Sequence, residues 1–107
     1  MPDLFAIPVS SDEPSYKIRV DLEGIDYVLR FNFNERMNRW VMGIYDAEET
    51  PIILGIALVV NYSLLRIYTV EGMPPGEMIL FDTSEKNQEC GRNDLGNRCI
   101  LVYENSV

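Results

Sequence analysis

Four acidic residues within one segment are the first candidates for chemistry. Asp82, Glu85, Glu89 and Asp94 lie in a polar stretch that also contains Gly91 and Gly96. Carboxylate oxygens are the ligands that Ca²⁺ prefers, so this stretch is a candidate cation site. The spacing lacks the central glycine and the closing glutamate of an EF-hand loop. We therefore expect a solvated acidic loop and no metal site.

Histidine is absent from the sequence, and this removes most other catalytic sites. Ser–His–Asp and Cys–His nucleophilic sites and all His-containing metal sites are excluded. Two cysteines cannot form a four-cysteine zinc site, and neither Gly-rich phosphate-binding motif is present. A carboxylate pair that hydrolyses glycosides is a weak alternative, because seventeen acidic residues form pairs by chance. We expect no enzyme, and we assign no catalytic, cofactor-binding or metal-binding residue.

Cys90 and Cys99 lie on either side of a short polar segment. A disulfide across that segment is one alternative. The N-terminal residues lack the basic and apolar pattern of a secretory signal, which indicates a reducing compartment. The expectation is therefore two free thiols.

Charge and length limit the partners. The chain has 107 residues, with seventeen Asp and Glu against nine Lys and Arg, and a net charge of −8. This charge disfavours nucleic acid and anionic membrane surfaces. The longest apolar run, residues 52–60, is too short for a transmembrane helix. We expect one domain over residues 1–107 that is made and assembled in the cytoplasm.

Strands are the elements that must position these residues. Residues 16–22 and 25–34 alternate apolar and polar side chains, and Glu23-Gly24 between them favours a tight hairpin turn. Residues 40–45, 78–81 and 99–103 predict further strands. The run 52–60 predicts a strand that is buried on both faces by a sheet or a neighbouring subunit, with a bulge at Gly55.

The segment 61–68 has two interpretations. Asn61 is able to cap a short helix, with Leu64, Leu65 and Tyr68 at helical spacing, and a bent strand is the alternative. The fold class that follows is all-β: a small antiparallel sandwich or barrel of about six or seven strands, with this helix as its only helical element.

The aromatic residues either pack in the core or line a ligand pocket. Most fall on the predicted inward face, which favours core packing: Tyr16, Tyr27, Phe31, Phe33, Trp40 and Tyr45. The alternative function is a stand-alone β-barrel module that binds a small ligand or peptide in a pocket lined by Tyr27, Phe31 or Trp40.

Several local strings, taken in order, resemble the baseplate plug family of contractile-tailed bacteriophages. These strings are Phe5-x-Ile7-Pro8, Tyr27-x-Leu29-x-Phe31, Asn34-x-Arg36-x-x-x-Arg39-Trp40, Gly55-x-x-Leu58, Leu64-Leu65-Arg66, Met73-Pro74-Pro75-Gly76-Glu77, Arg92-Asn93-Asp94-Leu95-Gly96 and Leu101-Val102-Tyr103. The likeness runs from Phe5 to Tyr103. Asn61-Tyr62-Ser63 and the two cysteines are departures from the family's pattern.

The resemblance implies a non-enzymatic virion protein at the centre of the tail baseplate. Its partners would be hub, spike and tube proteins, with further copies of itself in the assembly, and it transfers no catalytic residue or cofactor. We expect contact residues at Trp40, if it is exposed, and in two turns, which comprise Met73, Pro74, Pro75, Gly76 and Glu77, and Arg92, Asp94, Leu95 and Gly96. Four arginines are candidates for bidentate contacts with acidic partner groups, namely Arg36, Arg39, Arg66 and Arg92.

Overall fold

The alternating segments form the predicted hairpin. In the computed structural model, which describes residues 4–66, 68–84 and 88–105, β2 (Ser15–Leu22) pairs antiparallel with β3 (Ile25–Asn34). Glu23 and Gly24 form the turn with φ of 57° and 85°. Two left-handed residues are what the tight hairpin turn requires, and glycine adopts this conformation without strain.

Two more strands complete a four-stranded sheet. β4 (Arg39–Asp46) and β5 (Pro51–Ala57) follow in the order β2-β3-β4-β5. The pairing shifts by one residue between Met42, opposite Ile56, and Ile44, opposite Ile53, and Gly55 lies in this bulge with φ of 75°. The predicted bulge is confirmed. Burial of this strand by a sheet of its own chain is wrong, because β5 is an edge strand and Leu54 is 58% exposed. The other alternative, cover by a neighbouring subunit, stays a prediction.

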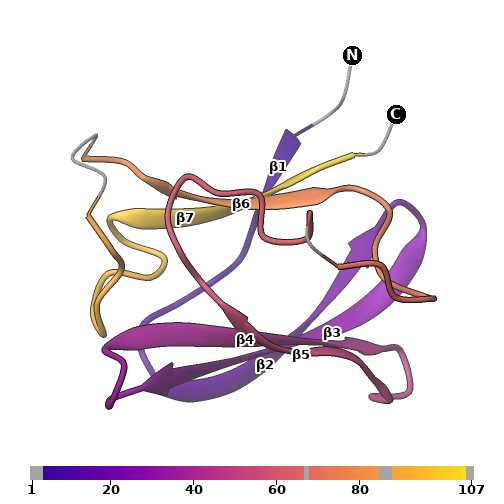
Figure 1. Cartoon of the computed structure of the whole chain (residues 1–107), viewed down its shortest axis with the longest axis horizontal. Coiled ribbons are helices and arrows are strands. Elements are labelled where there is room, and N and C mark those ends of the chain that lie inside the picture. Colours follow the sequence, from indigo (N-terminus) through magenta and orange to yellow (C-terminus); the bar gives the residue numbers. More distant parts are fainter. Residues whose placement is uncertain (1–3, 67, 85–87, 106–107) are drawn as a thin grey trace.

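A three-stranded sheet faces the first across the core (Figure 1). β1 (Leu4–Ile7), β7 (Cys99–Glu104) and β6 (Glu77–Asp82) are ordered β1-β7-β6, and all pairs are antiparallel. The apolar runs predict β6 and β7, but β1 was not predicted, because its four residues are too few to show a period. Leu4 at the start of β1 pairs with Glu104 at the end of β7, so the first and last strands of the described chain lie side by side (Figure 1).

The segment after β5 is not a helix. Two of its amide groups bond to β6: Asn61 N donates to Leu80 O at 2.7 Å and Leu64 N to Met78 O at 2.8 Å. Tyr68 N donates to Leu65 O at 3.1 Å, which closes a single turn. Asn61 has a φ of 61°, so it turns the chain along the edge of β6 instead of capping a helix. The helix expected over 61–68 is therefore wrong for the described residues of this segment. Ile67 lies outside the described residues.

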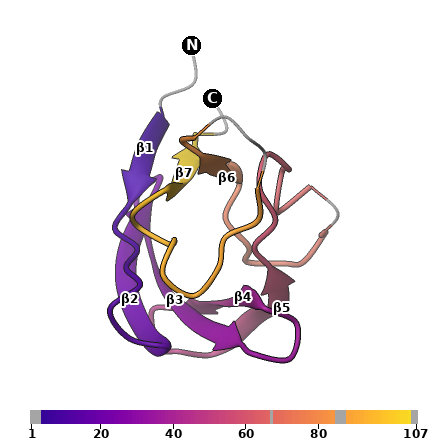
Figure 2. The ribbon, with the colours of Figure 1, turned by 90° about the vertical axis from the view of Figure 1, so that its left-hand side faces the viewer.

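The connections close the sides of the sandwich. Figure 2 shows β1 leading directly into β2 on one side and β5 leading up toward β6 on the other, with the segment between β6 and β7 across one end. The inward side chains of both sheets form one core; its largest members are Trp40, Tyr27, Tyr103 and Phe31. The fold is all-β and sandwich-like with seven strands, as predicted. Within the described ranges we find no helix of the length and apolarity that a membrane crossing needs.

Candidate functional site

The acidic loop is an ordered network around Arg98. The guanidinium group lies 2.7 Å from Asp82 Oδ1 and 3.1 Å from Asp94 Oδ2. Asp82 also accepts hydrogen bonds from the Ser84 hydroxyl at 2.6 Å and from Gln88 N at 2.9 Å. The prediction of a solvated acidic loop is wrong at Asp82, whose side chain is fully buried.

The network keeps both carboxyl groups charged. The Ser84 hydroxyl, followed by backbone amides and Arg98, holds the pKa of Asp82 far below its ordinary value. Arg98, followed by Gly91 N, lowers the pKa of Asp94. An acid–base pair needs pKa values that move apart, whereas both of these move in the same direction. The shared Arg98 joins the two carboxylates across the loop. Among the described residues no group of three or more Cys, Asp or Glu is placed to hold a metal ion, and Glu85 lies outside them.

Cys90 and Cys99 form a disulfide in the structure, so the expectation of free thiols is wrong. The bond joins the loop to the first residue of β7 and lies in the core, with both residues at 1% exposure or less. The redox environment alone does not determine whether two cysteines pair, because the fold also sets their distance. The fold places the Cα atoms 6.3 Å apart, which is within the ordinary range for a disulfide.

Trp40 is fully buried, so the condition for its role as a contact residue is not met. Its indole nitrogen donates to Gly91 O at 3.0 Å, and the Arg92 guanidinium lies over its ring at 5.6 Å. Tyr16 and Phe33 pack edge-on against the same ring. Trp40 thus connects the four-stranded sheet to the loop across the end of the sandwich.

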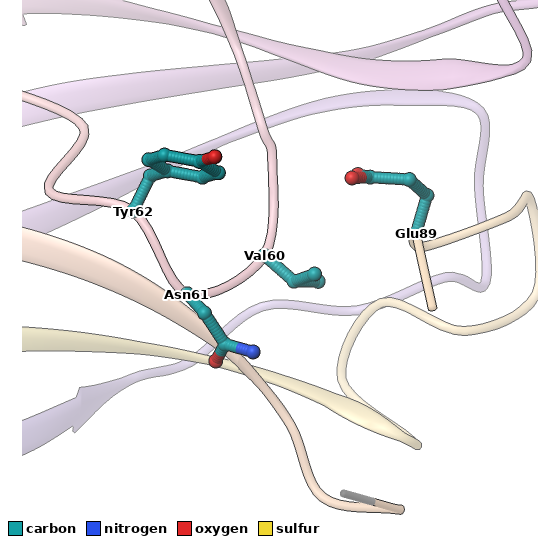
Figure 3. Close-up of a pocket in the computed structure, with 4 residues that line it drawn as sticks. All are labelled: Val60, Asn61, Tyr62 and Glu89. Atoms are coloured by element: carbon teal, nitrogen blue, oxygen red, sulfur yellow. The ribbon is translucent and has the colours of Figure 1, made fainter. Parts of the chain in front are cut away.

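The proposed ligand pocket is filled by the core. Tyr27, Phe31 and Trp40 have exposures of 1% or less and belong to the central hydrophobic cluster. A pocket of about 480 Å³ lies elsewhere, lined by Val60, Asn61, Tyr62 and Glu89 (Figure 3). The Tyr62 hydroxyl and the Glu89 carboxylate point toward each other across Val60, while Asn61 points away (Figure 3). Both polar side chains lie on exposed residues, so this hollow is an open surface feature.

The turn between residues 73 and 77 is held against Tyr103. Gly76 N donates to the Tyr103 hydroxyl at 2.7 Å, and this hydroxyl donates to Glu23 Oε2 at 2.6 Å. Burial, followed by the hydrogen bond to Glu23, raises the pKa of Tyr103, so the hydroxyl keeps its proton. Pro74 and Gly76 are buried, Met73 and Glu77 are half-buried, and Pro75 is exposed.

The turn at residues 92–96 packs against the segment between β1 and β2. Leu95 is fully buried. Gly96 has a φ of 82°, and a Cβ atom there would lie 2.5 Å from Val9 O, so only glycine fits. The Arg92 guanidinium donates to Ser11 O. Asp94 is engaged by Arg98, as described above. Gly96 remains exposed and Arg92 and Asp94 half-buried.

Arginine pairing is partly internal. Arg39 lies 4.0 Å from Glu89 Oε2, and Arg92 is held by Ser11 and Trp40. Arg36 and Arg66 are exposed, and no ion pair involves either within the described residues.

An apolar sheet face was missed by the sequence analysis. Side chains on the outward side of the three-stranded sheet form an outer apolar face, defined as Leu4, Ala6, Ile79, Phe81, Ile100 and Val102. Leu4 is 61% exposed, Phe81 41% and Ile100 36%. The signal was present, because residues 78–81 and 99–103 are uninterrupted apolar runs without alternation. Such runs are typical of strands covered on both faces.

Comparison with known families adds one match. Residues 4–106 match the family model described as "Cyanophage baseplate Pam3 plug gp18". No curated protein matches the chain. The match spans both sheets and every strand, and it agrees with the resemblance drawn from the sequence strings.

Proposed function

We propose, from the premise that the chain belongs to the cyanophage baseplate plug family, that it is a non-enzymatic structural subunit of a contractile phage tail baseplate. The observation that carries this proposal is the family match over nearly the whole chain. The location that follows from it is the tail baseplate of the virion. We further propose that the subunit is assembled in the host cytoplasm and contacts hub, spike and tube proteins near the tail axis.

The architecture supports a role in contact. The two polar clusters described above bond to groups of the same chain: Arg98 pairs with Asp82 and Asp94, and the Tyr103 hydroxyl accepts from Gly76 N. The outer apolar face exposes large apolar side chains to water, which costs free energy that a covering partner would recover. A subunit with this distribution is well suited to a packed assembly.

We also propose that residues of the two turns contact a partner. Pro75, Glu77 and Gly96 have exposed or half-buried positions from which a partner is accessible, and so have Arg92 and Asp94. Pro74, Gly76 and Leu95 are buried and would act by shaping these turns. We also propose that copies of the chain associate within the assembly.

The test is the solution mass of the protein, measured by light scattering. The protein would be measured alone and after co-expression with the hub, spike and tube proteins of the same tail. A stoichiometric complex with one of these proteins is the expected result. A monomer that binds none of them would contradict the proposal.

A further inference from the structure

The two outward sheet surfaces of the molecule differ in chemistry. The four-stranded sheet carries exposed Lys17, Arg19 and Arg30 on its outward side, and Glu49 lies 2.6 Å from Lys17 and 3.3 Å from Arg30. This surface is solvated in the ordinary way of an antiparallel sheet. The outer apolar face is its opposite, because β6 and β7 present apolar side chains on both sides.

Two acidic residues, Glu77 and Glu104, border the outer apolar face. Leu4 lies opposite Glu104 across β1 and β7, and Glu104 lies opposite Glu77 across β7 and β6. The two acidic residues therefore lie directly opposite each other on adjacent strands, on the outward side of the sheet. No ion pair involves Glu77 or Glu104 within the described part of the chain. Like charges directly opposite on a sheet are destabilising.

Glu77 adds an independent indication. Its Oε1 atom is buried and has no hydrogen-bond partner among the described residues. A buried carboxylate oxygen without a partner carries a desolvation cost. A cationic donor that reached this oxygen would offset the cost.

Charge favours a different chain over a second copy as the source of this cation. Each copy has a net charge of −8, so a second copy approaches this acidic border against a repulsive field, and contacts between copies are expected on other surfaces. Most of its described basic side chains are already engaged: Lys17, Arg30, Arg39 and Arg98 in ion pairs, and Arg19 and Arg92 with backbone carbonyl groups. The complement of this surface is a different, basic chain.

We propose that the outer apolar face is the docking surface for another protein, which covers Phe81 and Ile100 with apolar side chains and places an arginine or lysine between Glu77 and Glu104. This inference rests on the proposed function, because the partner is sought among the baseplate proteins. It specifies the contact surface and the charge of the partner.

The test uses the full-length protein and the purified hub, spike and tube proteins of the same tail, each titrated separately by calorimetry. The charge variant is Glu77→Gln with Glu104→Gln, and its matched control is Glu48→Gln, an exposed acid in the turn between β4 and β5. The apolar variant is Phe81→Ser, and its control is Leu54→Ser on the edge of the other sheet. Thermal unfolding of every variant checks that the fold is kept.

We expect each face variant to weaken binding by about tenfold or more, and each control by less than about twofold. Binding of the wild-type protein should also weaken as salt is raised, and the charge variant should lose this dependence. A complex that forms with equal affinity in the face variants would overturn the inference while the proposed function stands. Failure of all three proteins to bind would overturn both. Self-association of the wild type that Phe81→Ser abolishes would show that a second copy is the occupant, and would also overturn the inference.

Discussion

Replacing Gly76 with alanine is expected to destabilise the protein by about 4 kcal/mol. A Cβ atom at this position would lie 2.6 Å from the Tyr103 hydroxyl and 2.7 Å from its ring carbon Cζ, and it would also collide with the carbonyl oxygen of Glu104. The Tyr103 ring is fully buried and the carbonyl belongs to β7, so neither group can move aside cheaply.

The magnitude has two parts. Overpacking of a buried site costs about 1–3 kcal/mol. Displacing Gly76 N from the Tyr103 hydroxyl adds about 1–3 kcal/mol, because a buried donor loses its acceptor. A loss of about 4 kcal/mol is a large part of the stability of a domain of this size and lowers Tm by about 15–20 °C.

The assay is thermal and chemical unfolding of Gly76→Ala beside Gly24→Ala. Gly24 has a φ of 85° and no atom within 4 Å of its added Cβ, so alanine there carries only backbone strain of about 1–2 kcal/mol. A double-mutant cycle with Tyr103→Phe should show coupling, because that change removes one of the atoms that the added Cβ meets and also the acceptor of Gly76 N. The prediction is wrong if Gly76→Ala lowers the free energy of unfolding no more than Gly24→Ala does, or if the effects of Gly76→Ala and Tyr103→Phe are additive.

Two further predictions concern the loop between β6 and β7. Reduction of the Cys90–Cys99 disulfide should lower the free energy of unfolding by about 2.5 kcal/mol, because the bond closes a loop between cysteines nine positions apart. Denaturant midpoints measured with and without reductant test this, and equal midpoints would contradict it. The folded-state pKa values of Asp82 and Asp94 are lowered, so their contribution to stability is present above the unfolded value near 4 and is lost as pH falls below it. The midpoint should therefore decrease from about pH 5 to pH 3, and it should decrease less in Arg98→Gln, where Asp94 lacks its main partner; an identical pH dependence in the two proteins would count against the network.

Local pattern was enough for the hairpin and for the bulge. Residues 16–34 combine a period of two with a Glu-Gly turn, and each of these signals depends only on neighbours in the chain. Gly55 likewise marks its own conformation. The fold class followed from the number and spacing of such segments.

The wrong expectations all depend on contacts between distant segments. Asn61 has the residue type of a helix cap, but its backbone amide finds an acceptor on β6. Apolarity over residues 52–60 is divided between strand β5 and the segment that crosses to β6, so the run does not form one continuous strand. The disulfide and the burial of Trp40 depend on a loop that folds back over the end of the sandwich. Composition and period carry no information on such closures.

The strings on which the family resemblance rests turn out to determine the fold. Gly76 admits the Tyr103 hydroxyl, Leu95 fills the core, and Gly96 lets the loop approach Val9. These residues make the turns that hold two sheets together, so a match to them predicts architecture first. Specificity for a partner is then expected on side chains that the fold does not need, such as Phe81, Ile100 and Glu104. If this division is correct, substitutions in the turns will lower stability and binding together, whereas substitutions on the outer apolar face will lower binding while the unfolding midpoint is unchanged.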